Sequence, residues 1–147
     1  VYHGHWRHNK GGIDLNRDWA DFNQPETSAI RDFMKMLMDS TGGKFYFGVD
    51  FHSTLEDIYY TIDPEMEGNM PGLVPALIEA TARVFPDYTP NIKPNSLEEA
   101  RITSSSFLFF EFGAEALTYE VGDHTPRDFV LKKGEMTATK LMELMLE

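Results

Sequence analysis

Hydrophobic residues recur at the spacing of an α-helix in three segments of the chain. The first segment begins at Pro25, since proline is tolerated in the first turn, and ends before Gly42, a residue type that commonly terminates helices. Its apolar stripe consists of Ile30, Phe33, Met34, Leu37 and Met38. The same spacing predicts helices over residues 73–85 and 135–146.

Two short apolar runs have the composition of β-strands. Residues 44–51 (KFYFGVDF) are apolar on both alternating faces, as expected of a strand that is covered on both sides. Residues 116–121 (ALTYEV) form the second run. The serines at 104–106 could cap a short apolar segment over 107–112, and the proline-containing residues 86–94 indicate an extended loop.

Helices that alternate with buried strands indicate an α/β fold with a mixed, largely parallel sheet and helices on both faces. At 147 residues the chain is long enough to bury a hydrophobic core. No repeat, low-complexity segment or linker divides it, so residues 1–147 are predicted to form a single domain.

The net negative charge of the chain argues against two classes of binding partner. A net charge of −11 opposes binding to nucleic acid and to anionic membranes, because both depend on clustered basic side chains. No apolar run approaches the ~18 residues of a membrane-spanning helix. We therefore expect a soluble protein without a nucleic-acid or membrane partner. The chain begins with Val1 rather than methionine, so residues upstream are expected and the compartment stays unassigned.

Three polar groups stand where buried strands are predicted to end. They are the pair Asn16-Arg17, His52 and Glu120. In open α/β sheets, ligands bind in the crevice beyond the carboxyl ends of the strands, and a charged group there must be paired, bound to metal or exposed to a cleft. The chain has no cysteine, so imidazole and carboxylate groups would have to hold any metal. Together these residues predict one convergent site.

The segment Gly12-Ile-Asp-Leu-Asn-Arg-Asp-Trp19 resembles the G-[IV]-D-x-N-R-N-[FW] signature of the zinc carboxypeptidase family, the carboxypeptidase A superfamily. The resemblance implies that Asn16 and Arg17 grip the free carboxylate of a substrate. Arginine suits this role, because its planar fork matches a carboxylate with two hydrogen bonds and keeps its charge. Asp18 departs from the family's usual asparagine. Without the surrounding motif, an Asn-Arg pair would be read as a surface loop.

Two further segments extend the resemblance. Asp50-Phe51-His52-Ser53 is similar to the family's D-[LIF]-H-[ST] segment, which implies that His52 is the last of three protein ligands of Zn²⁺. A nearby carboxylate such as Asp50 can fix the tautomer of a ligating imidazole. The run from residue 116 to 122 resembles the family's final T-x-E strand, which implies that Glu120 is the general base on zinc-bound water. The alternatives are a structural histidine and a glutamate paired with a basic side chain.

Arg7 precedes the Asn-Arg pair, as an arginine does in the family, which implies a role in stabilising the oxyanion. Out of this context, Arg7 would be a solvated loop arginine. The family's capping tyrosine has no counterpart, because residues 90–106 contain no tyrosine. The side-chain specificity pocket is expected near residues 104–110, with Arg101 close by.

The family's first zinc motif, H-x-x-E, does not occur in this sequence. We therefore expect residues 1–147 to be the C-terminal portion of a metallocarboxypeptidase-like catalytic domain, whose N-terminal part is absent from this chain. A non-metallic relative is the other explanation. Since one histidine is too few ligands for catalytic zinc, the 147-residue chain alone is expected to be inactive.

Three functional hypotheses follow. The first is a zinc carboxypeptidase that removes the C-terminal residue of a peptide. The second is an N-acyl amino acid deacylase resembling aspartoacylase and succinylglutamate desuccinylase, which share the Asn-Arg, histidine and glutamate pattern. The third is a carboxylate-binding module without catalysis. A substrate panel of peptides and N-acyl amino acids separates the first two.

Overall fold

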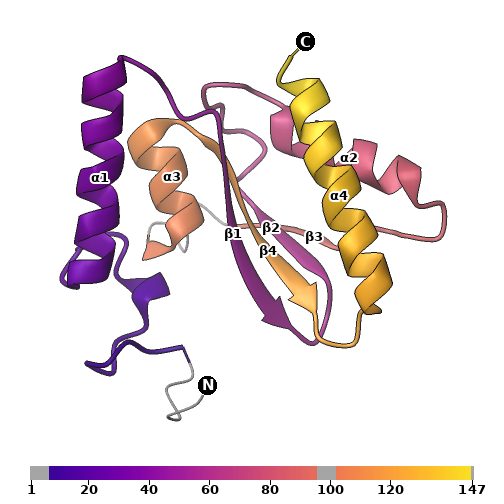
Figure 1. The fold of residues 1–147 in the computed structure, drawn as a ribbon, viewed down its shortest axis with the longest axis horizontal. Helices are drawn as coiled ribbons and strands as arrows, with labels where there is room; N and C mark the ends of the chain where they lie inside the picture. Colours follow the sequence, from indigo (N-terminus) through magenta and orange to yellow (C-terminus); the bar gives the residue numbers. More distant parts are fainter. Residues whose placement is uncertain (1–6, 96–101, 147) are drawn as a thin grey trace.

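A four-stranded sheet forms the centre of the molecule in the computed structural model, which describes residues 7–95 and 102–146 (Figure 1). The strand order is β1-β4-β2-β3. β4 pairs parallel with β1 and antiparallel with β2, and β2 pairs parallel with β3. The predicted mixed, largely parallel sheet is therefore confirmed. The elements are the 3₁₀ helix η1 (Leu15–Arg17), α1 (Pro25–Thr41), β1 (Phe47–Thr54), β2 (Ile58–Thr61), α2 (Leu73–Val84), β3 (Ile92–Pro94), α3 (Ser104–Phe112), β4 (Glu115–Gly122) and α4 (Arg127–Leu144).

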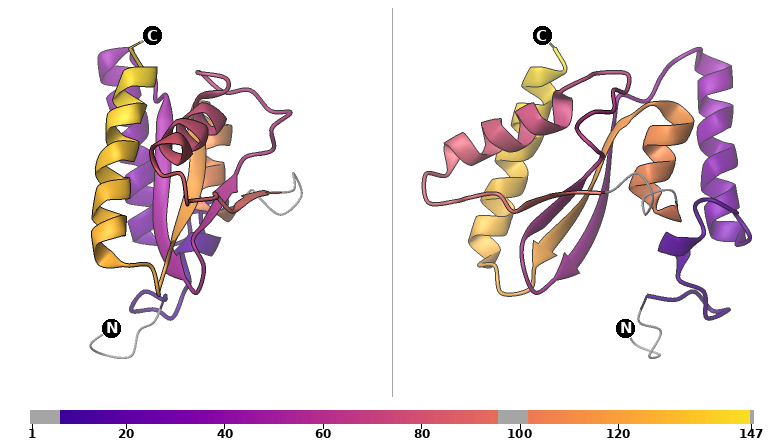
Figure 2. Two further views of the ribbon diagram at one scale, coloured as in Figure 1. Left: turned by 90° about the vertical axis from the view of Figure 1, so that its right-hand side faces the viewer. Right: turned by 180° about the vertical axis from the view of Figure 1, so that it is seen from behind.

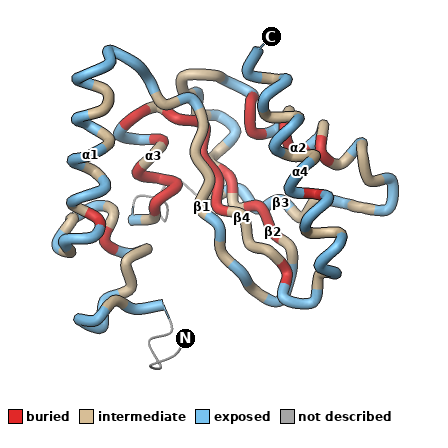
Figure 3. Tube along the Cα trace, in the orientation of Figure 1, coloured by how far each residue is buried: buried red, intermediate tan, exposed pale blue. Residues whose placement is uncertain are grey.

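Helices lie on both faces of the sheet, as predicted. α2 and α4 lie side by side on one face, and α3 lies on the other, with α1 outside it (Figure 2). An ion pair between Lys35 and Glu111, 2.5 Å long, joins α1 to α3. The buried positions concentrate on β4, β2 and the helix faces turned toward them (Figure 3). The core cluster consists of Tyr59, Val74, Ile78 and Leu117.

The close approach of α3 to β1 determines where the site forms. A Cβ atom on Gly48 would lie 2.6 Å from Leu108 Cδ1, so a larger residue here would require the Leu108 side chain to shift. The ring of Trp19 stacks on Phe107 with centroids 5.1 Å apart. This stacking holds the segment after η1 against α3. As a result, η1 lies next to the first turn of α3.

Several element boundaries differ from the predictions. β1 covers Phe47–Thr54 rather than residues 44–51, because the polar residues after Phe51 continue the ladder with β4 up to Gly122. β1 is also not covered on both faces, since Phe51 is 68% exposed at the outer strand of the described sheet. α4 begins at Arg127 rather than at residue 135, directly after Pro126.

Other elements were not predicted, or their ends were assigned to the wrong residues. β2 and β3 were not predicted, because each has only four or three residues and depends on its partner strand. The cap of α3 is Thr103, whose side chain accepts from the amide of Ser106. The three serines instead lie buried in the first turn. Within the described residues, the Asn16-Arg17 pair follows no strand. It lies in the 3₁₀ helix η1, which the side chain of Asp14 caps.

Candidate functional site

A cavity of about 530 Å³ opens at the carboxyl ends of β1 and β4. It contains all five residues that were predicted to form the site. Its lining is polar and comes from η1, β1, β2, β4 and the loops beside them. The lining residues are Arg7, Asp14, Asn16, Arg17, His52, Ser53, Thr54, Tyr60, Asn95, Thr103, Thr118 and Glu120.

His52 lies on β1, on the same side of the strand as Asp50. Its Nε2 atom lies 2.8 Å from Asp50 Oδ2, and the Ser104 hydroxyl donates to the same carboxylate oxygen. The hydrogen bond to Asp50 raises the pKa of the His52 imidazole, against the opposing effect of burial. Burial would raise the pKa of Asp50, but the bonds from His52 and Ser104 hold it below its ordinary value. An ionised Asp50 therefore faces an Nε2–H group.

Asn16 connects η1 to both β1 and α3. Its Oδ1 atom accepts from the amide of Ser104 at 2.9 Å, which orients Nδ2 toward His52 Nε2 at 3.2 Å. Nε2 cannot both donate to Asp50 and accept from Asn16. The shorter contact with an ionised carboxylate favours donation to Asp50. This tautomer leaves the Nδ1 lone pair of His52 available to a metal.

The two arginines are held differently. Arg17 is exposed, and its Nη1 donates to the Asn16 carbonyl at 2.8 Å, which leaves its other N–H groups for a ligand. Arg7 lies 3.7 Å from Asp14, and its side chain is 52% exposed. Asp14 also accepts from the amide of Asn16 at 3.0 Å. One carboxylate thus supports both the 3₁₀ turn and the nearby cation.

Glu120 lies beside His52 in the parallel ladder of β1 and β4. Its Oε2 atom is buried and has no hydrogen-bond partner within residues 7–95 and 102–146. In the same part of the chain it forms no ion pair, so the alternative of a glutamate paired with lysine or arginine is not observed. A buried carboxylate oxygen without a partner indicates a position for a proton donor or cation.

Seven lining residues were not predicted as site residues: Asp14, Ser53, Thr54, Tyr60, Asn95, Thr103 and Thr118. The T-x-E alternation could have identified Thr118, which shares a strand face with Glu120. Tyr60 could not be found, because β2 was not recognised. The specificity pocket was expected near residues 104–110. Among the described residues 102–110, Thr103 alone lines the cavity, and Arg101 lies outside the described residues.

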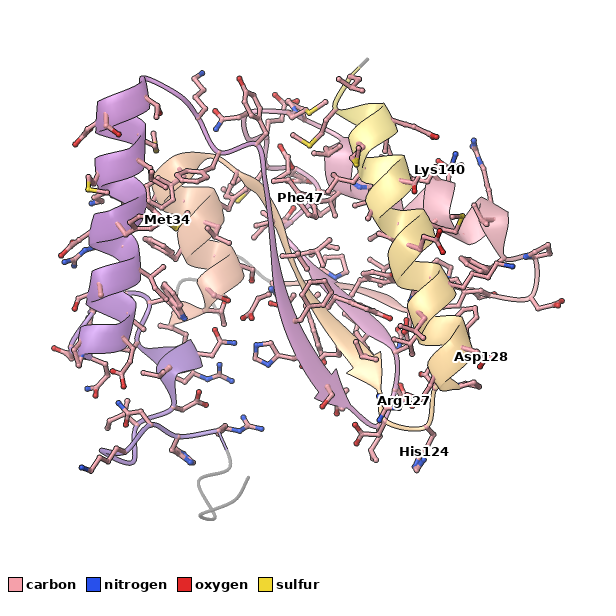
Figure 4. All side chains as sticks on the ribbon, viewed as in Figure 1. Met34, Phe47, His124, Arg127, Asp128 and Lys140 are labelled. Atoms are coloured by element: carbon pink, nitrogen blue, oxygen red, sulfur yellow. The ribbon has the colours of Figure 1, made fainter. Side chains whose placement is uncertain are left out.

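The described part of the chain does not supply a full metal site. No three histidine, aspartate or glutamate side chains gather there in a way that could hold an ion. His124 lies at the connection between β4 and α4 (Figure 4), and it does not line the cavity. His52, with its carboxylate on Nε2, fits one ligand position. His3 and His5 lie outside the described residues.

Comparisons with known proteins support the fold. No protein-family model and no curated protein matches the sequence. A metallo-carboxypeptidase from Burkholderia cenocepacia matches with a TM-score of 0.60 and 22% identity, over 95% of this chain and 40% of that one. Candidate metallopeptidases from Shewanella denitrificans OS217 and Shewanella amazonensis SB2B match with TM-scores of 0.58 and 0.52 at 17% and 16% identity.

The Shewanella matches cover 92% and 93% of this chain and 53% and 55% of those chains. The chain therefore spans about half the length of these solved structures, or less. At this level of identity the likeness establishes a metallopeptidase-like fold. Among the described helices, none is long and apolar enough to cross a membrane.

Proposed function

We propose that this chain contributes to zinc-dependent hydrolysis of an amide bond next to a free carboxylate, in the form of removal of a C-terminal residue from a peptide. One observation carries the proposal. A single cavity contains a guanidinium group, an imidazole oriented by a carboxylate and a buried glutamate oxygen without a recorded partner. The fold shared with a metallo-carboxypeptidase supports the same reaction class.

Arg17 and Asn16 would hold the substrate carboxylate. The Asn16 carbonyl fixes one edge of the Arg17 guanidinium, and the remaining N–H groups can bind both oxygens of a carboxylate. The Asn16 amide is oriented by Ser104, so this end of the cavity is prepared before a ligand arrives. Placing the carboxylate here would bring the adjacent amide bond toward His52 and Glu120.

His52 would hold zinc through Nδ1, with further ligands from outside the described residues. When bound, zinc would polarise a carbonyl oxygen and make water more acidic. The described residues fit this group only in part, because one oriented imidazole is present and a full ligand set is not. We therefore also propose that residues 1–147 are the C-terminal portion of a larger catalytic domain.

Glu120 would take a proton from the attacking water at Oε2 and deliver it to the leaving amine. Its buried, unpaired oxygen can do so without first breaking a hydrogen bond recorded among the described residues. Arg7 would donate to the carbonyl oxygen as negative charge develops there, while Asp14 restrains the Arg7 guanidinium. The carbonyl carbon thus gains a hydroxyl group, and the C–N bond breaks.

The test uses the protein at its natural length, loaded with zinc. We expect hydrolysis of an acylated dipeptide with a free C-terminus and none of the matching C-terminal amide. Equal rates for the two peptides would contradict the carboxylate clamp. Faster hydrolysis of simple N-acyl amino acids than of peptides would assign the deacylase reaction instead.

A second readout is independent of activity. Metal analysis should find one zinc per molecule at natural length, and the variant His52→Ala should lose it. The 147-residue chain alone should retain no stoichiometric zinc, because the described residues offer a single suitable imidazole. Stable absence of zinc at natural length would support a carboxylate-binding module without catalysis.

A further inference from the structure

The imidazole of His52 has two neighbours that make opposite demands on one ring nitrogen. Nε2 lies 2.8 Å from Oδ2 of the ionised Asp50, which can only accept a hydrogen bond, and 3.2 Å from Nδ2 of Asn16, which can only donate one. An imidazole that carries its proton on Nε2 satisfies Asp50, and one that carries it on Nδ1 satisfies Asn16. His52 therefore has two competing hydrogen-bonded states.

The backbone amide of Ser104 determines which atom of Asn16 faces the imidazole. This amide can only donate, and it lies 2.9 Å from Oδ1 of Asn16. An exchange of the Asn16 oxygen and nitrogen would leave the Ser104 amide facing a second donor. Asn16 therefore presents its donor group, Nδ2, to His52, and the competition for Nε2 follows from the way η1 meets α3.

The two states of His52 differ in their ability to bind a metal. When Nε2 carries the proton and donates to Asp50, Nδ1 has a free lone pair. When Nε2 accepts from Asn16, Nδ1 carries the proton and cannot act as a ligand. Within residues 7–95 and 102–146, no hydrogen bond to Nδ1 is recorded. The population of the second state therefore lowers the affinity of His52 for a metal.

A carboxylate bound at the clamp changes this competition. The guanidinium of Arg17 donates to the carbonyl of Asn16 at 2.8 Å, so the two carboxylate-binding groups belong to adjacent, connected residues. A charged carboxylate oxygen is a stronger hydrogen-bond acceptor than a neutral imidazole nitrogen. Nδ2 of Asn16 bonds to such a ligand in preference to His52, and Nε2 is then left to donate to Asp50.

We propose that a carboxylate ligand held by Asn16 and Arg17 raises the affinity of His52 for zinc, because it removes the competing hydrogen bond from Asn16 to Nε2. This inference rests on the proposed function, which assigns the carboxylate to the clamp and zinc to His52. By linkage, the affinity for the carboxylate rises by the same factor when zinc is bound. Removal of one neutral hydrogen bond corresponds to a factor of about 2 to 10.

The test measures the zinc affinity of the protein at natural length, by competition with a chromogenic chelator. Saturating N-acetyl-L-threonine should raise this affinity about 2- to 10-fold. N-acetyl-L-threonine amide, which lacks the carboxylate, should leave it unchanged. A second measurement needs no metal: in the zinc-free protein at pH 9, ¹⁵N NMR should show a larger fraction of His52 protonated on Nε2 when the acid is bound.

Asn16→Ala distinguishes this coupling from direct contact between the acid and zinc. The variant lacks the competing donor, so it should bind zinc more tightly than the parent does without the acid, and the acid should give no further increase. Asn23→Ala, at an exposed position, should behave like the parent. An acid that raises the zinc affinity equally in Asn16→Ala would overturn the proposal. A lower zinc affinity of Asn16→Ala would also overturn it, because Asn16 would then support the imidazole rather than compete for it.

The outcomes also separate the coupling from the proposed function. Zinc and acid that bind independently of each other would overturn the coupling and leave the proposed function intact. Absence of zinc from the protein at natural length, or equal binding of the acid and its amide, would overturn the proposed function and the coupling with it.

Discussion

The two faces of β1 and β4 treat buried charge in opposite ways. On one face, the carboxylate of Glu120 has a buried oxygen without a partner in the described part of the chain. On the other face, the ammonium of Lys133 is 3% exposed and contacts both oxygens of Asp57 at 2.8 and 2.9 Å. The hydroxyls of Tyr88 and Tyr119 complete that cluster.

This difference indicates that the cluster around Lys133 stabilises the fold, whereas the cavity around Glu120 is suited to bind a ligand. The cluster around Lys133 joins β4, α4 and the loops near β2, and its polar groups satisfy one another. The cavity around Glu120 keeps unused donors and acceptors, which is unfavourable for folding unless a ligand uses them. Because alternate residues of a strand point to opposite faces, adjacent Tyr119 and Glu120 belong to the two different environments.

The largest expected effect is on catalysis. Glu120→Gln should lower turnover of the zinc-loaded protein by about 10²- to 10⁴-fold, because the amide cannot take the proton from water. The free energy of unfolding should not decrease, since the substitution breaks no hydrogen bond or ion pair among the described residues. Steady-state kinetics and urea unfolding measure the two effects. Glu135→Gln, at an exposed position of α4, is the matched control, and an equal loss of turnover there would refute the assignment.

The reverse pattern is expected on the other face. Lys133→Met should reduce the free energy of unfolding by about 3 kcal/mol, because the partly buried Asp57 would lose its cation. Urea denaturation measures the change. Lys132→Met, one residue away and exposed, should stay within about 0.5 kcal/mol of the parent. If the Lys133 variant is as stable as the Lys132 variant, the cluster does not stabilise the fold.

Alkaline pH should lower the free energy of unfolding through the tyrosines around Lys133. Burial raises the pKa of Tyr59 to about 12, and burial also raises the pKa values of Tyr88 and Tyr119. Above pH 10 the unfolded chain releases these protons while the folded chain keeps them, so stability falls by about 1.4 kcal/mol per pH unit for each tyrosine. The lowered pKa of Lys133, caused by burial, has the opposite sign but involves one group.

Urea denaturation at pH 9, 10 and 11 measures this slope. Tyr59→Phe should make the decline shallower, because one of the groups that must stay protonated is removed. The exposed Tyr46 should have no influence when changed to phenylalanine. A stability that rises between pH 10 and 11 would mean that the lysine dominates the cluster.

The smallest expected effect concerns ligand affinity alone. Arg17→Met should weaken binding of N-acetyl-L-threonine by about 10- to 150-fold, which corresponds to the loss of hydrogen bonds to a charged group. The affinity of Arg17→Lys should lie between those of the parent and of Arg17→Met, because lysine keeps the positive charge but cannot form two parallel hydrogen bonds to a carboxylate. NMR titration measures all three proteins. Arg83→Met, at an exposed position of α2, should bind like the parent, and unchanged affinity in the Arg17 variants would exclude the clamp.

Local patterns predicted α1, α2 and β4 closely, whereas the start of α4 was missed. The amphipathic stripe of α2 and the apolar run of β4 depend on nearby residues, so a single pass along the chain identifies them. β2 and β3 could not be recognised, because such short strands are stabilised by pairing with β4 and with each other. The boundaries of β1 were wrong for a related reason, since its polar end belongs to the ladder.

The residues of the candidate site also differ in whether the sequence alone could identify them. The motif residues from Arg7 to Glu120 were identified by their resemblance to a family, and they lie in one cavity, although their roles stay predictions. Tyr60 carried no signal until β2 was placed against β4. The pairing of Asp57 with Lys133 spans 76 positions of the chain, and no local pattern indicates it.

The single amide of Asn16 has a consequence for the order of folding. It contacts one group 36 positions away and another 88 positions away, so the arrangement exists only after three distant parts of the chain have met. Contacts across such separations form late, since the closure entropy of long loops must first be overcome. A refolding molecule should therefore regain ligand binding only in its last folding step. The rate at which binding of a carboxylate ligand returns would measure the rate of that step.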